Sequence, residues 1–356
     1  MLRTLNVFSI SLGIAIVFCL ASMGCGTSGN TLLSAPTSTI HPQSQPATGP
    51  TLGYVWDTAG QALRPVRGVP GASIVGSALS NVPGGGTSIV AAASSARSGI
   101  AVYLDVKGNL YQSPLAGGAS TRIASVPGAT SLIINNSGSY VLLTGKANSG
   151  SNVAALISGL PQGAATHALD VSTLTGALSG AVSDTGAVVL ASSSSQATGS
   201  VQLLAYGGQS AGTSIGTLQA FGGMQFVPGS DELIAADGGT GAFTTISHVS
   251  TTPVSASLST TASIASPASL DITSDGRWVV AANHAGDVLR IDLTGAQAAV
   301  KAHCSCVPAQ VSTMTGTTLR LVTEGGGPLW IVDAGGVSPR VLFVPAITAA
   351  SVGGKS

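Results

Sequence analysis

From Leu52 onward, the hydrophobic residues of this chain fall into short runs that are separated by turns containing glycine. Two kinds of turn alternate, one between a pair of expected strands and the other one strand later. The first kind lies at 135–138, 183–186, 227–229, 274–276 and 314–316, and the second at 57–60, 105–108, 148–150, 198–199, 239–241, 283–286 and 324–327. Turns of the second kind recur roughly every 45 residues, a period typical of a repeat that folds as one four-stranded sheet.

The clearest repeat predicts four strands, at 269–272, 277–282, 287–293 and 298–301. In its third strand Leu289 and Ile291 share one face, whereas Arg290 and Asp292 share the other, which predicts a sheet with unequal faces. Other runs, such as 140–143, are apolar on both faces, as expected for a sheet packed between two neighbours. Because no later stretch combines a sustained 3.6-residue period with capping residues, we predict an all-β protein.

The two ends of the repeat region complement each other. The body opens at 53–56 and 62–66, which correspond to the second and third strands of a repeat, so the first strand is missing there. After the last complete repeat ends near Val344, the segment 345–352 parallels 127–133, the first strand of another repeat. We predict that the C-terminal strand pairs with the N-terminal strands and closes a ring, because a closed ring leaves no exposed sheet edge.

This organisation resembles the β-propeller superfamily, which includes WD40-like and YVTN-like repeat proteins, across residues 52–352. The resemblance lies in the period and the strand pattern, because Trp56-Asp57 is a single Trp-Asp pair that does not recur. The segment 63–72 is similar to one near the start of uncharacterised exported bacterial propeller lipoproteins. The resemblance implies a propeller of four-stranded blades, and the seven recurring turns favour seven blades over six or eight. A parallel β-helix and a pair of β-sandwiches are the rival folds.

The N-terminus has the layout of an export signal. Arg3 precedes an apolar stretch at 5–20, and the small-residue segment 21–25 follows it. Residues 20–25 resemble the lipobox of bacterial lipoproteins, which implies lipidation of Cys25 and an outer-membrane or periplasm-facing location. Ser22 and Met23 depart from the usual lipobox residues, so simple cleavage with secretion, or retention as an uncleaved anchor, stays open.

Three regions follow from these patterns. We assign residues 1–25 to a signal peptide with a lipobox-like cleavage site. Residues 26–51 consist largely of Gly, Ser, Thr, Pro, Asn and Gln without periodicity, which predicts a flexible tether. Residues 52–356 form the predicted propeller.

The charge content narrows the function. Charged residues make up 7% of the chain and the formal net charge is zero, so few side chains are available for acid–base chemistry. No basic cluster follows Arg3. Nucleic acid is therefore excluded as a partner, since neutralising its phosphates needs a clustered positive face.

His303-Cys304-Ser305-Cys306 is the most distinctive cluster after the export signal. In an extended strand the Cys304 and Cys306 side chains would lie too far apart for a disulfide, but Val307-Pro308 favours a loop that could bring them together. Export to an oxidising compartment favours a disulfide between them. A soft-metal site and a buried pair of free cysteines are the alternatives.

The remaining candidate motifs predict no site. Two overlapping G-x-S-x-G matches, at 208–212 and 212–216, lack the strand-to-helix context of serine hydrolases. The predicted turns contain several aspartates, whose side chains we expect to accept hydrogen bonds from their own turn backbone: Asp57, Asp105, Asp184, Asp237, Asp275 and Asp333. Trp278 and Trp330 lie in strands and are expected to pack between blades. We therefore assign no catalytic, cofactor or metal residues.

These observations favour a non-enzymatic binding or scaffold protein displayed at the bacterial cell envelope. Its expected partner is an envelope protein or a small-molecule or glycan ligand, and its contact with the membrane is an N-terminal lipid anchor. The alternatives are a propeller enzyme, such as a lactonase, lyase or quinoprotein-like oxidoreductase with a site at the central channel, and a structural envelope or adhesion protein.

Overall fold

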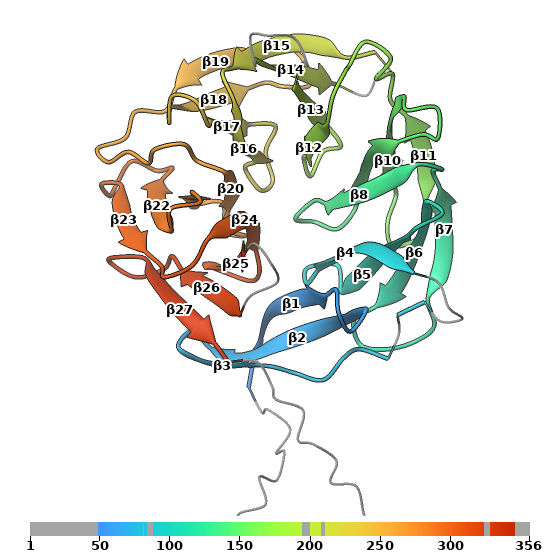
Figure 1. The fold of residues 1–356 in the computed structure, drawn as a ribbon, viewed down its shortest axis with the longest axis horizontal. Coiled ribbons are helices and arrows are strands. Elements are labelled where there is room, and N and C mark those ends of the chain that lie inside the picture. Colours follow the sequence, from blue (N-terminus) through green and yellow to red (C-terminus); the bar gives the residue numbers. More distant parts are fainter. Residues whose placement is uncertain are drawn as a thin grey trace, which may run out of the picture. The chain divides into compact units, whose positions relative to one another are not determined.

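A computed structural model describes residues 49–80, 82–83, 88–193, 200–207, 211–323 and 328–345. The strands form seven antiparallel sheets, arranged as blades around one axis (Figure 1). Every regular element in these ranges is a strand. The same ranges hold no helix long and apolar enough to cross a membrane. The prediction of an all-β, seven-bladed propeller is confirmed.

Blade 1 contains three strands, β1 Thr51–Asp57, β2 Ala62–Val69 and β3 Ala72–Val75, and blades 2 to 7 contain four each. The strands of blades 2 to 4 are β4 Ile89–Ser95, β5 Ile100–Asp105, β6 Asn109–Pro114, β7 Thr121–Ser125, β8 Ala129–Ile134, β9 Val141–Lys146, β10 Asn152–Ser158, β11 Ala165–Ala168, β12 Leu178–Val182, β13 Val188–Ser193, β14 Val201–Tyr206 and β15 Thr213–Leu218. Those of blades 5 to 7 are β16 Phe221–Phe226, β17 Leu233–Asp237, β18 Phe243–Ser247, β19 Val254–Ser257, β20 Ser269–Ile272, β21 Trp278–Ala282, β22 Asp287–Asp292, β23 Val300–His303, β24 Pro308–Thr313, β25 Thr318–Thr323, β26 Leu329–Asp333 and β27 Arg340–Val344.

In blades 2 to 7 the first strand lies nearest the axis and the fourth lies at the outer edge (Figure 1). The hydrophobic cores lie between neighbouring blades. Ile234 of blade 5, for example, packs in one cluster with Ile272 and Val279 of blade 6. Second strands are buried along most of their length, since they have a strand on each edge and a blade on each face, and every residue of β5 and β21 is buried.

The third strand of blade 6 corrects one expectation. The alternation in β22 suggested unequal faces, but Val288, Arg290 and Asp292 are as buried as Leu289 and Ile291. The neighbouring blade 7 covers the face that carries the charges. Arg290 reaches that blade, so burial of the charged face depends on contacts between blades that are far apart in sequence.

The two kinds of predicted turn are confirmed wherever the structure describes them. Turns of the first kind join the first and second strands of a blade, and turns of the second kind join the second and third strands. In the turn after β20, Gly276 has φ of 74°, a left-handed conformation that glycine adopts without strain. The expected turns at 198–199 and 324–327 lie outside the described residues.

Blade 1 lies between blades 7 and 2 and completes the ring. Thr315 Oγ1, in the first turn of blade 7, donates a hydrogen bond to Leu52 O at 2.6 Å. At the other end of β1, Gln61 Oε1 accepts one from Ile89 N of blade 2 at 3.0 Å. These contacts give β1 the place of a second strand, as predicted. Most of the segment expected to supply the first strand, 346–352, lies outside the described residues, so pairing of the chain ends stays a prediction.

Candidate functional site

The first strands of blades 2 to 7 surround a cavity of about 1080 Å³ at the axis of the ring. Tyr54 and Trp56 of β1 also line it, because blade 1 has no first strand among the described residues. Apolar side chains such as Phe221 and Leu270 alternate with exposed polar ones such as Ser131 around the wall. A cavity of this size is sufficient for a small-molecule ligand.

Two charged residues interrupt this pattern at one level of the ring. Asp271 lies on β20, one residue before its end, and the corresponding positions of the other first strands are uncharged: Ser94, Ile133, Ala181, Gln225 and Ser312. Arg320 lies on β25 opposite Ser312, and the corresponding second-strand positions are buried and apolar: Ala101, Leu142, Val189, Ile234 and Val280. Such exceptions to a regular pattern are candidates for a function.

Asp271 is buried and joins three blades. Its Oδ1 accepts hydrogen bonds from Gln225 Nε2 of blade 5 at 2.8 Å and from Ile272 N at 2.7 Å. Its Oδ2 accepts one from Thr313 N of blade 7 at 2.7 Å. Burial raises the pKa of the Asp271 carboxyl, although these hydrogen bonds act in the opposite direction.

Arg320 is half-buried in the wall of the same cavity. Removal from water lowers the pKa of its guanidinium, and the nearby charge of Asp271 raises it. Within the described ranges no acceptor lies at hydrogen-bond distance from Arg320. The indole Nε1 of Trp56 is buried without an acceptor in the part of the chain that the structure describes, and its ring packs against Tyr103 of blade 2, away from Arg320. Arg320 is therefore the residue that presents unpaired hydrogen-bond donors to the cavity.

Asp184 fixes the rim of the cavity where the first turns lie. Its Oδ1 accepts hydrogen bonds from Asn135 Nδ2 at 2.7 Å and Ser137 N at 2.8 Å, both in the turn of blade 3. Its Oδ2 accepts one from Gly229 N of blade 5 at 2.9 Å. We expected Asp184 to bond its own turn, but Ser183 does so through its Oγ. Asp184 instead holds three adjacent turns together, which makes this rim rigid.

The other turn aspartates behave as predicted. Each accepts a backbone hydrogen bond from its own turn: Asp57 from Gly60, Asp105 from Lys107, Asp237 from Gly239, Asp275 from Arg277 and Asp333 from Gly335. The bond from Gly60 N is the main factor that lowers the pKa of Asp57. These carboxylates are therefore occupied in holding turns.

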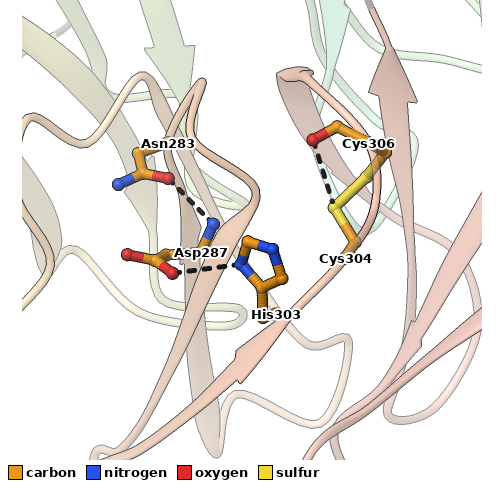
Figure 2. The surroundings of a disulfide bond; sticks show 5 residues. All are labelled: Asn283, Asp287, His303, Cys304 and Cys306. Carbon is orange, nitrogen blue, oxygen red and sulfur yellow. Dashed lines mark hydrogen bonds and ion pairs between the residues drawn. A yellow bond between two sulfur atoms is a disulfide. The ribbon is translucent and has the colours of Figure 1, made fainter.

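A disulfide joins Cys304 and Cys306 in the connection from β23 to β24, with their Cα atoms 5.1 Å apart (Figure 2). This connection is a loop, so the obstacle expected for an extended strand does not arise. His303 is exposed and its Nδ1 lies 3.3 Å from Asp287 Oδ1, an ion pair when the imidazole is protonated (Figure 2). Cys25, the predicted lipidation site, lies outside the described residues.

The remaining motifs have structural positions. The G-x-S-x-G match at 212–216 falls on β15, an outer strand, and the match at 208–212 lies partly outside the described residues. Trp278 is buried, and the guanidinium groups of Arg277 and Arg290 lie over its ring, 4.3 and 4.1 Å from the centroid. Trp330 packs edge-on against Phe343 in blade 7. No group of three His, Cys, Asp or Glu residues within the described ranges could hold a metal ion.

Comparisons with known proteins agree with the fold. No family model and no curated protein matches the chain. A functionally unknown protein from Desulfotomaculum acetoxidans DSM 771 is 14% identical with a TM-score of 0.57, and the match covers 83% of this chain and 99% of that one. PorZ, a surface component of the type-IX secretion system of Porphyromonas gingivalis, is 15% identical with a TM-score of 0.54, covering 84% of this chain and 38% of PorZ. At these identities, the likeness shows the propeller fold alone.

Proposed function

We propose that this protein is a non-enzymatic binding module of the bacterial cell envelope and that its central cavity receives the ligand. The observation that carries the proposal is a cavity of about 1080 Å³ with a wall made mostly of small, apolar and uncharged polar residues. Asp184 and Asp271, the two carboxylates among its described lining residues, each accept three hydrogen bonds from the protein. They position strands and turns, which suits a preformed site.

The envelope location rests on the sequence. The export signal and the lipobox-like segment ending at Cys25 support an exported, lipid-anchored protein with a tether before the propeller. PorZ, which shares the fold, is described as a bacterial surface component, and this adds weak support. Lipid labelling of the full-length chain in cells tests the anchor, because Cys25→Ala should abolish the label. A Cys25→Ala variant that is labelled as strongly as the wild type would contradict it.

A propeller enzyme is the second candidate, and one observation favours it. Asp271 is a buried carboxyl with a raised pKa beside a cationic group in a cavity, which is the setting of a general acid. The binding function is preferred because Asp271 already accepts hydrogen bonds from three blades and the other lining carboxylate lies at the rim. Catalysis would require Asp271 to reach a bound substrate while keeping these contacts.

The binding proposal can be tested with a variant that fills the cavity. Ser131 is exposed on β8 and lines the cavity, so Ser131→Trp should occupy the space that a ligand needs. Ser255→Trp, on the exposed outer strand β19, makes the same change away from the cavity. Native mass spectrometry of protein incubated with envelope extract should show an added mass on the wild type and on Ser255→Trp, but not on Ser131→Trp. Equal added mass on both variants, or none on the wild type, would contradict the proposal.

A further inference from the structure

We propose that the ligand of the central cavity carries an oxyanion, a carboxylate or a phosphate, on an apolar body, and that Arg320 holds the oxyanion. This inference rests on the proposed function and specifies the chemistry of the ligand. It follows from the position of Arg320 in the fold, from the hydrogen bonds that the cavity leaves unmade, and from the apolar residues around them.

Arg320 occupies a position that the fold otherwise fills with apolar residues. In blades 2 to 6 the corresponding residue of the second strand is buried and apolar, as at Leu142 and Val280. A guanidinium there loses hydration, which costs free energy unless a partner replaces the lost water. An apolar residue would pack between the blades without that cost. Apart from the nearby charge of Asp271, the guanidinium has no ionic or hydrogen-bond partner among the described residues, and this favours a role in binding.

The hydrogen bonds around Arg320 leave its donors available. A guanidinium has five N–H donors and no acceptor. Arg320 lines the cavity and makes no hydrogen bond within the described part of the chain. Asp271, the nearby carboxylate, directs its two oxygens to Gln225, Ile272 and Thr313. A ligand that satisfies these donors must present acceptors, and a planar guanidinium matches an oxyanion in a bidentate geometry.

The protein already holds the carboxylates of the cavity. Both oxygens of Asp271, the carboxylate near Arg320, accept hydrogen bonds from protein donors. The other lining carboxylate, Asp184, lies at the rim and is held by three donors. Arg97, the other lining cation among the described residues, is exposed in a first turn. Arg320 is therefore the cation that an anion inside the ring would meet.

The wall around these donors defines the rest of the ligand. Tyr54, Phe221, Phe226, Leu270 and Val322 line the same cavity. An apolar body would bury surface against these side chains, which contributes affinity without specific geometry. The combination predicts a small amphipathic acid and disfavours an inorganic anion, which would leave the apolar wall unused.

The test is calorimetric titration of the full chain with three probes of similar shape: benzoate, phenyl phosphate and neutral benzamide. We expect at least one anion to bind, and benzamide to bind at least about tenfold more weakly, because charged hydrogen bonds contribute more than neutral ones. The tighter of the two anions identifies the carboxylate or the phosphate class. Sulfate serves as an anion without an apolar body and should bind more weakly than both.

Variants assign the effect to the named residues. Arg320→Gln should weaken binding of the anion at least about tenfold, and Arg320→Lys should restore part of it through charge. Arg122→Gln makes the same charge change on the exposed outer strand β7 and should have no effect. Circular dichroism checks that each variant folds; if Arg320→Gln does not, Arg320→Lys still tests the assignment, because it keeps the charge but loses the bidentate geometry.

The outcomes separate this inference from the proposed function. Benzamide binding as tightly as the anions, equally in wild type and Arg320→Gln, would overturn the oxyanion site while leaving a ligand-binding cavity. No binding of either organic anion at millimolar concentration would also overturn it, whereas the proposed function would still depend on the Ser131→Trp experiment.

Discussion

Arg290 in blade 6 and Arg320 in blade 7 both direct their side chains toward the next blade, but the surroundings of the two side chains differ. Arg290 is fully buried, and its Nη groups donate to the backbone oxygens of Ala334 at 2.9 Å, Gly336 at 2.5 Å and Val337 at 2.8 Å in blade 7. Arg320 pairs across the sheet with Ile331, which packs on blade 1, so it leaves β25 on the blade 1 side. There Arg320 lines the cavity, and it makes no hydrogen bond within the described ranges.

We call the interface between two neighbouring blades a seam. The seam between blades 6 and 7 and the seam between blades 7 and 1 also differ in their contacts. Between blades 6 and 7, Arg290, the ring of Trp278 and a continuous apolar cluster join the sheets. Between blades 7 and 1 the contacts are a smaller apolar cluster around Val66 and the hydrogen bond from Thr315 to Leu52. Arg290 stabilises the ring through donation from both of its Nη groups, although its buried Nε has no acceptor among the described residues. Arg320, which lies beside the cavity, is available to a ligand.

Removing Arg290 should have the largest effect on stability. Arg290→Ala removes the donor to the oxygen of Ala334, a buried residue, and the donors to the exposed residues Gly336 and Val337; it also removes the cation over Trp278. We therefore expect a loss of about 2–4 kcal/mol in the free energy of unfolding. Arg277→Ala is the matched control, because Arg277 also lies over Trp278 but its side chain is 41% exposed; it should cost about 1 kcal/mol or less. Chemical denaturation measures both. Equal losses would show that Arg290 does not hold the seam.

The second largest effect concerns closure of the ring beside blade 1. If residues 345–352 supply the first strand of blade 1, truncation after Val344 removes that strand. A loss of about 2 kcal/mol would lower the melting temperature of a domain of this size by about 4–8 °C. Deletion of residues 26–48, which belong to the predicted tether, is the control and should leave the melting temperature unchanged. An unaltered melting curve after truncation would mean that blade 1 is stable with three strands.

The sequence predicted what depends on local pattern. Strand alternation and Gly-containing turns are set by neighbouring residues, so the blades, their strand order and the role of Asp57 or Asp105 could be derived. The hydrogen bonds of Asp184 could not, because its partners lie 47 residues away at Ser137 and 45 residues away at Gly229. Only the alignment of successive blades brings such residues together.

The charged pair of the cavity was missed for a related reason, although a signal was present. Arg320 interrupts the apolar strand Leu319-Arg320-Leu321, and Asp271 lies between Leu270 and Ile272. Within one strand, each of these residues fits the ordinary alternation of polar and apolar residues. Aligning the repeats residue by residue shows that the corresponding positions of the other blades carry uncharged residues. This comparison would have identified both Arg320 and Asp271.

A third prediction restores the common pattern at Arg320 alone, because Asp271 accepts three hydrogen bonds that asparagine could not keep. Arg320→Leu should keep the free energy of unfolding within about 1 kcal/mol of the wild-type value, because buried apolar residues fill the corresponding positions of blades 2 to 6. The same variant should lose anion binding. Arg122→Leu on the outer strand β7 should change neither property. A larger loss of stability in Arg320→Leu would show that Arg320 contributes to folding, which would remove the contrast with Arg290.

The disulfide near the seam between blades 6 and 7 should have the smallest effect. Cys304 is buried in the same cluster as Trp278, and Cys306 packs against it. A bond between residues two apart closes so short a loop that its entropic contribution is at most about 1.6 kcal/mol before strain is subtracted. We therefore expect Cys304→Ser with Cys306→Ser to cost about 1 kcal/mol, well below Arg290→Ala. Intact mass before and after reduction should differ by two hydrogen atoms, and two alkylatable thiols in the native protein would show that the seam forms without the bond.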